Sequence, residues 1–260
     1  MKIKAIAPWF GGKRNMAGEI IKHLGKHQAY WEPFCGSMAV LMAKPVCTME
    51  TVNDLHGDLI NLASVLAVEV AGAELYRRLA TTLMHEDLFT AAADRFKARG
   101  HQRGGFADVD RAYDFFLASW MGRNGVAGTG SYNQGFCVRY TKNGGHAATR
   151  FVSAVESIPE WHHRLRSVTI LNRDGIELLE RIEDSPGVAI YLDPPYLKKG
   201  CLYVHDFTSD DHQRLAEQAR RFKRTRVVVS YYDDPRLDDL YPDWHKIDCT
   251  RTKKRCVTPA

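Results

Sequence analysis

The sequence predicts an α/β fold, in which a doubly wound sheet is assembled from both ends of the chain around a mostly helical insertion. Short apolar runs that are typical of buried strands alternate with helical patterns before residue 61 and after residue 167. Between these limits the strand patterns largely vanish. Polar side chains directly follow four of the expected strands, and open α/β sheets bind ligands at the carboxyl ends of their strands.

Residues 14–68 carry the first helices and strands that these patterns predict. Ile20, Ile21 and Leu24 share one helical face, and Gly25 directly after them is a typical helix end. Ser37 is a residue type that caps helices. In chain order, we expect a helix over 14–25, a strand over 29–32, a helix over 37–44 capped by Ser37, a strand over 46–52 and a helix over 55–68.

The middle of the chain is predicted to be helical, with helices over 73–83, 87–99, 110–121 and 152–165. The loop over 122–150 is rich in Gly, Asn, Thr, Ser, Arg and Tyr, and loops of this length are usually functional or disordered. After residue 167 the alternation resumes. We expect strands over 168–171, 188–193, 226–231 and 244–249, and helices over 175–182 and 209–221.

The composition is ordinary for a globular chain: 260 residues, 45% hydrophobic and 26% charged. No apolar run reaches transmembrane length, and Met1 to Ile6 lacks the long apolar stretch of a signal peptide, so the cytoplasm is the expected compartment. The six cysteines form no CxxC pair, and His162-His163 is not part of an HExxH motif. This pattern favours reduced thiols, and we expect no metal site.

The net charge of +5 and the isoelectric point near 8.8 permit a polyanionic partner without requiring one. Two basic clusters are each either a solvated surface or a set of phosphate contacts. The first cluster consists of Arg220, Arg221, Lys223, Arg224 and Arg226, and the second of Arg251, Lys253, Lys254 and Arg255.

The most informative motif is Asp193-Pro194-Pro195-Tyr196, which follows the apolar run 187–192. Two prolines stop a strand and hold the turn open, because proline has no N–H and a fixed φ. The Asp193 carboxylate and the Pro194 carbonyl can then accept hydrogen bonds from an exocyclic amine, while the Tyr196 ring can stack on a planar base. Taken alone, such a motif is more often only a strand-end turn with a buried tyrosine.

Three other strand ends carry polar or glycine-containing segments: 32–37, Asn53-Asp54 and 172–174. The glycine at position 36 allows close approach to a ligand, and an acidic residue after a strand can accept hydrogen bonds from ribose hydroxyls. No GxGxxG and no GxxxxGK[ST] is present, so the loops that bind pyrophosphate and triphosphate are absent. A nucleoside ligand without pyrophosphate, such as S-adenosylmethionine, fits better.

In combination, these segments resemble the Dam-type family (D12 class) of N6-adenine DNA methyltransferases. The resemblance covers about 6–62 and 166–249. It is carried by the opening motif Trp9-Phe10-Gly11-Gly12-Lys13, the cofactor motif over 32–40, Asn53-Asp54 and the catalytic Asp193-Pro194-Pro195-Tyr196, in the order of the family. It implies a Rossmann-like methyltransferase core over 1–61 and 166–260, with a helical target-recognition insertion over 62–165 that binds DNA.

The resemblance also implies roles for individual residues. Catalysis falls to Asp193, Pro194, Pro195 and Tyr196. The S-adenosylmethionine pocket and its rim are assigned to Trp9, Phe10, Gly12, Lys13, Glu32, Phe34, Gly36, Ser37, Asp54 and Asp174. Lys13 can approach either the cofactor carboxylate or the flipped nucleotide, and the alternative for Trp9, Phe10 and Phe34 is a role as core aromatics.

The insertion departs from the family pattern at Arg123, where an aromatic residue often precedes the Asn-Gly pair of a loop that approaches DNA. The candidate DNA-binding residues are Arg123, Asn124, Tyr132, Asn133 and Arg139. A second departure is at the C-terminus, where the family usually adds another apolar strand. Here 251–256 runs directly into 257–260, so we expect the final strand to be missing or replaced.

The expected activity is transfer of a methyl group from S-adenosylmethionine to N6 of an adenine flipped out of double-stranded DNA. A membrane or metal partner is not expected, and a monomer is favoured. Two alternatives stay open. The amine could belong to RNA or to a protein glutamine, or the chain could be a DNA-binding homologue without catalysis.

Overall fold

The computed structural model describes residues 5–100, 106–123, 135–138, 146–197 and 204–249, and the backbone of 254–259. It divides into two compact units. The first comprises 1–12, 36–38 and 56–170, and the second comprises 13–35, 39–55 and 171–260. Assignment of 62–165 to target recognition stays a prediction.

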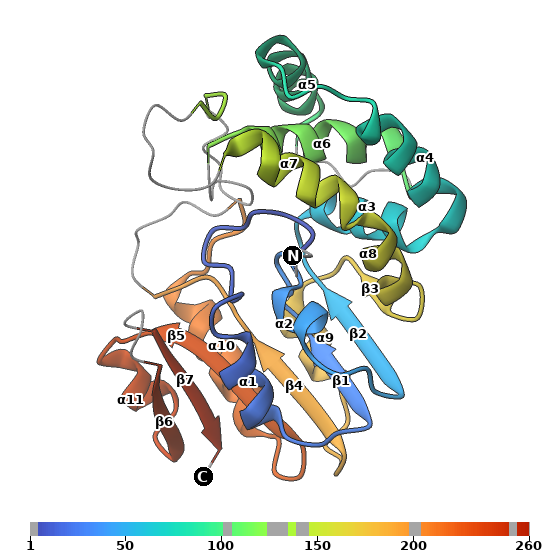
Figure 1. The fold of residues 1–260 in the computed structure, drawn as a ribbon. Helices are drawn as coiled ribbons and strands as arrows, with labels where there is room; N and C mark the ends of the chain where they lie inside the picture. The colour runs from blue at the N-terminus through green and yellow to red at the C-terminus, as the bar shows by residue number, and fades with distance from the viewer. Residues whose placement is uncertain are drawn as a thin grey trace. The chain divides into compact units, whose positions relative to one another are not determined.

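The second unit is built on a sheet with the strand order β3-β2-β1-β4-β5-β7-β6 (Figure 1). Strands β1, β2, β4 and β5 are parallel, whereas β7 runs antiparallel to both β5 and β6. The predicted α/β class is therefore confirmed. The strands are β1 (Ala29–Glu32), β2 (Met49–Asn53), β3 (Thr169–Leu171), β4 (Val188–Leu192), β5 (Arg226–Tyr232), β6 (Trp244–Cys249) and β7 (Lys254–Pro259).

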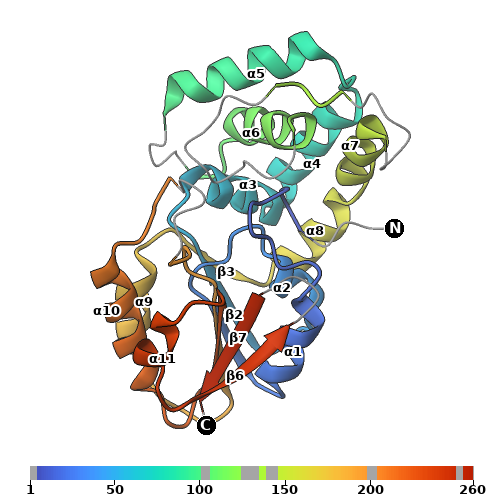
Figure 2. The same ribbon diagram turned by 90° about the vertical axis from the view of Figure 1, so that its left-hand side faces the viewer.

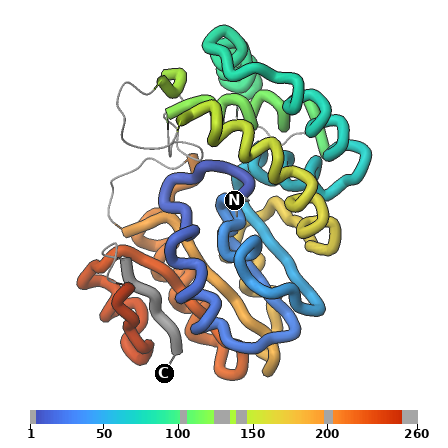
Figure 3. The backbone as a smooth tube through the Cα atoms, in the orientation of Figure 1, coloured from blue at the N-terminus to red at the C-terminus, as the bar shows by residue number. Residues whose placement is uncertain are grey.

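Strands from distant parts of the sequence lie side by side in this sheet. The tube in Figure 3 runs through the blue strands β1 and β2 and returns in orange as β4 beside β1. Because β2 lies on one side of β1 and β5 lies beyond β4, the strand order reverses between β1 and β4. At such a switch point the connections leave in opposite directions and a ligand crevice opens at the carboxyl ends of the strands.

Helices cover both faces of the sheet, as Figure 2 shows. One face carries α1 (Ala17–Leu24) and α2 (Ala39–Ala43), and the other carries α9 (Gly175–Glu180), α10 (Ser209–Arg220) and α11 (Arg236–Leu240). Thr208 and Asp211 form a reciprocal capping box that begins α10, because each side chain accepts the other residue's backbone N–H.

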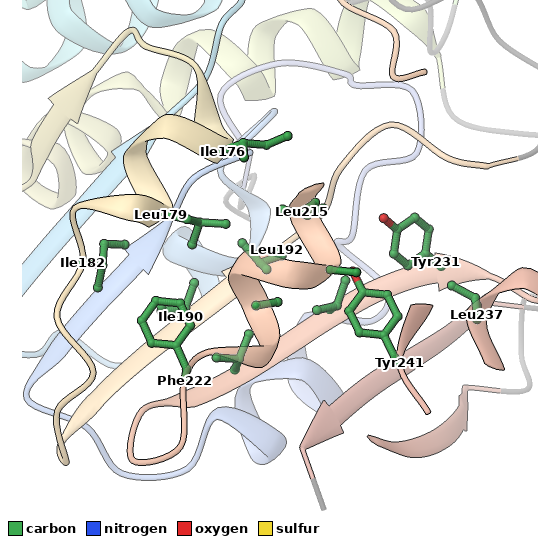
Figure 4. Close-up of a cluster of buried hydrophobic side chains, with 14 of the residues drawn as sticks. Ile176, Leu179, Ile182, Ile190, Leu192, Leu215, Phe222, Tyr231, Leu237 and Tyr241 are labelled. Carbon is green, nitrogen blue, oxygen red and sulfur yellow. The ribbon is translucent and has the colours of Figure 1, made fainter. Parts of the chain in front are cut away.

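A core of aliphatic and aromatic side chains lies between α9, α10 and the strands β4 and β5 (Figure 4). Leu192, Leu215 and Val229 are completely buried there, and each such side chain contributes about 1.5–3 kcal/mol to folding. Tyr196 belongs to the same cluster. The turn that follows β4 is therefore anchored directly on the core.

The first unit is helical in its described parts. Its helices are α3 (Gly57–Ala67), α4 (Glu69–Ala80), α5 (Glu86–Arg99), α6 (Val109–Met121), α7 (Ala147–Glu156) and α8 (Ile158–Leu165). Nearly all of α6 is buried, and Arg111 on this helix forms a buried ion pair with Asp58 of α3. Such a pair fixes the mutual position of the two helices, because separating two buried opposite charges is costly.

Several sequence predictions need correction. The final strand is neither missing nor replaced, because β7 pairs with both β5 and β6. Basic residues followed by a short apolar run are not a typical strand pattern, so the sequence did not predict β7. Main-chain hydrogen bonds to the strands on both sides hold it in the sheet. The single helix predicted over 152–165 is two helices separated at Ser157, with Pro159 in the first turn of α8. Helix α11 was not predicted, and β2 begins at Met49 instead of Val46.

Candidate active site

The candidate site begins where β4 ends. Asp193 follows Leu192, and the two prolines after it keep the chain from pairing further as a strand. Its carboxylate forms an ion pair with the ammonium group of Lys13, which contacts both carboxylate oxygens. The Lys13 side chain is 3% exposed and that of Asp193 is 20% exposed. Lys13, the last residue of the opening motif, therefore lies against the carboxylate of the catalytic motif.

Tyr196 forms the second contact of Lys13. Its hydroxyl oxygen lies 2.5 Å from Lys13 Nζ, and the same ammonium lies 5.0 Å from the centre of the ring. The ring packs edge-to-face against Tyr232, with centroids 4.5 Å apart. Tyr196 is buried, so the tyrosine that the motif analysis weighed as a core residue is indeed in the core. Its stacking on a base stays a prediction.

Ser230 on β5 is a residue of this site that sequence reasoning missed. Its hydroxyl donates a hydrogen bond of 2.9 Å to Asp193 Oδ1 and lies 2.9 Å from the Tyr191 hydroxyl. The run Val227 to Tyr231 looks like a plain buried strand, so a polar residue inside it was the available signal.

Glu32 is the last residue of β1 and is buried near Asp193. Its carboxyl accepts a hydrogen bond of 2.8 Å from the Tyr30 hydroxyl. Burial raises the pKa of Glu32 to about 8, and the nearby charge of Asp193 adds to the increase, while the Tyr30 hydrogen bond opposes it. At neutral pH this carboxyl is therefore mostly neutral.

Asn53 joins three strand ends through one side chain. Its Nδ2 donates to the carbonyls of Pro33 at 2.8 Å and Arg173 at 3.0 Å, and its Oδ1 accepts the Arg173 N–H at 2.9 Å. These bonds satisfy both amide hydrogens, so the loops after β1 and β3 are held against the end of β2. The sequence flagged Asn53 only as the neighbour of Asp54.

Asp54 and Asp174 lie in the loops that Asn53 holds. Asp54 is half-buried, and its backbone bonds to Leu171 and Asn172. Asp174 caps α9 through Oδ1, which accepts the N–H groups of Ile176 and Glu177 at 2.8 and 3.0 Å. Among the residues that the structure describes, no donor reaches Asp174 Oδ2, so this oxygen can accept from a ligand.

Phe34 lies against the start of α9. A Cβ on Gly175 would come within 2.5 Å of the Phe34 ring, so any larger residue there requires that ring to move. On another side the ring meets the edge of Phe207, with centroids 5.6 Å apart. Phe34 is half-buried, and Phe207, which the sequence analysis did not single out, forms part of its surroundings.

The first unit holds the other predicted cofactor residues: Trp9, Phe10, Gly12, Gly36 and Ser37. Gly36 has φ +43°, and a Cβ there would come within 2.9 Å of the Trp9 indole nitrogen. Both constraints favour glycine. Ser37 is buried, and its carbonyl accepts the Ile6 N–H at 3.1 Å. Helix α2 begins at Ala39 instead of following Ser37 directly.

Of the candidate DNA-binding residues, only Arg123 lies in the described part of the chain. It is exposed, and its N–H donates to the Gly135 carbonyl at 3.2 Å beside a bridge between Gly122 and Phe136. Asn124, Tyr132, Asn133 and Arg139 lie outside the described residues.

The first basic cluster lies at the opposite end of the parallel strands from Asp193, around the start of β5. Arg221 donates to the carbonyls of Leu179 and Ile182 at the end of α9, and Arg226 is the first residue of β5. Arg221 therefore has a structural role. Arg251 and Lys253 of the second cluster lie outside the described residues.

Within the described ranges there is no group of three or more His, Cys, Asp or Glu side chains that could hold a metal ion. Cys35, Cys47, Cys137 and Cys249 are free thiols. In the same ranges no single helix is long and apolar enough to cross a membrane, although α3 and α4, bent by 103° at their junction, reach that length and composition together.

Comparison with known proteins points to one family. The model of the D12 class N6 adenine-specific DNA methyltransferases matches residues 9–253. The Retron Ec67 DNA adenine methylase of Escherichia coli is 28% identical over 260 residues, covering 96% of this chain and 85% of that protein. The DNA adenine methylase of Serratia marcescens is 23% identical over 257 residues, covering 94% of this chain and 88% of that protein.

A solved structure, the rRNA methyltransferase AviRa of Streptomyces viridochromogenes, aligns over 95% of this chain and 84% of its own with a TM-score of 0.45 and 11% identity. A similarity at this level adds nothing to the assignment.

Proposed function

Because the chain belongs to the D12 class family of N6 adenine-specific DNA methyltransferases, we propose that it methylates N6 of an adenine in duplex DNA with S-adenosylmethionine as the methyl donor. The observation that carries this proposal is the ammonium group of Lys13 on the Asp193 carboxylate. A nitrogen with several N–H groups is already bound there, against Tyr196 Oη at 2.5 Å. The carboxylate is thus placed to accept hydrogen bonds from an amine.

The residues present fit the cofactor. Asp54, half-buried after β2, can accept hydrogen bonds from ribose hydroxyls, and the available Oδ2 of Asp174 can accept from the adenine amine. Phe34 offers an apolar surface between Gly175 and Phe207. The strand order reverses between β1 and β4, where α/β sheets bind nucleotides. When bound, S-adenosylmethionine supplies a methyl group on a positively charged sulfur.

Asp193 and the Pro194 carbonyl act on the substrate amine. The lone pair of the adenine amine is delocalised into the ring, so the amine is a weak nucleophile. Acceptors for its two hydrogens favour a pyramidal nitrogen and stabilise the positive charge that develops as the nitrogen–methyl bond forms and the sulfur–methyl bond breaks. The proton released from the nitrogen then passes to Asp193.

The proposed reaction requires two further steps. The adenine must leave the duplex, because N6 is inaccessible inside the base stack. Lys13 must also leave at least one oxygen of Asp193, because an ammonium that contacts both oxygens competes with the incoming amine for the same acceptors. Lys13 is thus a group that the substrate replaces.

The test is methyl transfer to unmethylated genomic DNA with labelled S-adenosylmethionine, beside the Asp193→Ala variant. We expect N6-methyladenine with the intact protein alone, and mapping of the modified positions would identify the target sequence. Label in RNA or in glutamine instead would reassign the substrate. Cofactor binding without any transfer would identify a DNA-binding homologue without catalysis.

A further inference from the structure

A chain of hydrogen bonds reaches Asp193 from the interior of the sheet. Leu192 on β4 pairs with Val229 on β5, so the next residues, Asp193 and Ser230, are neighbours at the point where β4 ends. Tyr191 and Asp193 lie two residues apart and hence project to the same side. Ser230 lies between their side chains, 2.9 Å from the Tyr191 hydroxyl and 2.9 Å from Asp193 Oδ1.

The direction of both hydrogen bonds follows from the number of protons available. A serine hydroxyl has one hydrogen, and Ser230 must donate it to Asp193 because an ionised carboxylate can only accept. The Tyr191 hydroxyl therefore donates to Ser230 Oγ. Tyr191 is 1% exposed and Ser230 is fully buried. Hydrogen bonds that are linked in this way and shielded from water strengthen one another.

Because of these linked hydrogen bonds, the two oxygens of Asp193 have different hydrogen-bond partners. Oδ1 accepts from Ser230 and Lys13, and the Tyr196 hydroxyl lies 3.5 Å away. Among the described side chains, Oδ2 receives Lys13 alone. When Lys13 leaves, Oδ1 keeps its serine donor, and Oδ2 becomes the open acceptor.

We propose that Tyr191 and Ser230 are positioning residues, which hold Oδ1 of Asp193. Oδ2 then accepts a hydrogen bond from the substrate amine and afterwards the proton that the amine releases. This inference rests on the proposed methyl transfer. Neither residue touches the substrate. Both act by keeping the carboxylate from rotating away from the orientation that transfer requires, and a misoriented acceptor lowers the rate more than it lowers binding.

The experiment compares four variants in single-turnover and steady-state methylation of unmethylated genomic DNA. Ser230→Ala should lower kcat about 10-fold, which corresponds to about 1.4 kcal/mol, with KM for DNA and for S-adenosylmethionine within about 2-fold of the unmodified protein. Tyr191→Phe should lower kcat about 3-fold. The double variant should be no slower than Ser230→Ala, because the two groups act through one hydrogen bond. Ser230→Thr, which keeps the hydroxyl, should restore most of the rate.

The matched control is Thr225→Val, which removes a buried hydroxyl directly before the start of β5. Thr225 Oγ1 donates to the Ser185 carbonyl at 3.1 Å, so the change affects stability without reaching Asp193. Its kcat should stay unchanged. Thermal unfolding and calorimetric binding of S-adenosylmethionine, measured on every variant, separate a lost fold from a lost orientation.

The possible failures are distinct. If the unmodified protein transfers no methyl group, the proposed function is wrong and this inference falls with it. If that protein is active and a folded Ser230→Ala variant matches it in kcat, only the inference is overturned. Should Ser230→Ala fail to fold, the Tyr191→Phe variant decides. An unchanged kcat contradicts the positioning role, and a lower kcat with unchanged KM supports it.

Discussion

One aspartate lies in the loop before strand β4 and another directly follows the strand, and the two carboxylates are bound in different ways. Asp184, before the strand, accepts the backbone N–H groups of Lys223, Arg224 and Thr225 at 2.8 to 3.2 Å. Asp193, after the strand, is bound by the side chains of Lys13 and Ser230.

The pKa of Asp184 shows how strongly the three backbone N–H groups stabilise its charged form. Partial desolvation would raise it, but the three N–H groups outweigh that effect and lower the pKa to about 2. Backbone donors cannot leave without unfolding the turn, whereas a lysine side chain can swing away. A carboxylate saturated by main chain therefore builds the fold, and one held by a replaceable side chain can serve a substrate.

The largest expected effect comes from removing the two aspartates in turn. Asp193→Ala should lower methyl transfer by at least about 10³-fold, because the acceptor for the amine hydrogens and the proton is lost. Asp184→Ala should leave kcat within about 2-fold and lower the free energy of unfolding by about 1 kcal/mol, as loss of a helix cap does. Methylation assays and urea unfolding measure the two quantities. Equal losses of activity would remove the distinction.

A second contrast lies in two lysine–carboxylate pairs. Lys44 and Glu50, near the start of β2, form a 2.5 Å pair with side chains 0% and 1% exposed. Lys44→Met removes the cation from a buried ion pair, so it should cost about 3 kcal/mol of unfolding free energy. Lys13→Met should cost less, since Asp193 is 20% exposed and keeps Ser230. Urea unfolding of both variants tests this order, and a greater loss in Lys13→Met would contradict it.

Two glycines sharpen the comparison between the strand ends. Gly175→Ala places a methyl group 2.5 Å from the Phe34 ring, so it should weaken S-adenosylmethionine binding by about 10-fold by displacing that ring. Gly187→Ala, directly before β4 at φ +80°, should cost about 1–2 kcal/mol of stability through backbone strain and leave binding unchanged. Calorimetry measures the binding of S-adenosylmethionine, and thermal unfolding measures stability. A binding defect in Gly187→Ala would count against a cofactor site at the other end.

The smallest expected effect is on pH dependence. In the folded protein the pKa of Glu32 is about 8, above its ordinary value of 4.5. Between these values the folded state retains a proton that the unfolded chain releases, so the stabilising contribution of Glu32 is complete below about pH 4.5 and is lost as the pH rises through 8. Glu32→Gln should therefore become more stable relative to the unmodified protein by at least about 1 kcal/mol from pH 6 to pH 9. Unfolding curves at these two pH values check the trend, and a constant difference would contradict the raised pKa.

Local patterns predicted more of the fold than of the site. The apolar run before Asp193 and the helix patterns in the middle of the chain carry their periods in consecutive residues, so β4 and α6 could be predicted. Strand β7 could not be predicted in this way, because it forms through pairing with β5 and β6 and not through a pattern in its own residues. Likewise, Ser230 and Asn53 act through residues 37 and 120 positions away, and no local pattern records such contacts.

The sequence by itself determined the alternation of strands and helices, the order of the motifs and the resemblance to the D12 class, because each is written in residues close together along the chain. Only the tertiary structure decided that Lys13 meets Asp193, 180 residues later, and that Ser230 and Tyr191 support the same carboxylate. The physical reason is that parallel strands bring distant residues together at their carboxyl ends, where hydrogen bonds depend on distance in space and not along the chain.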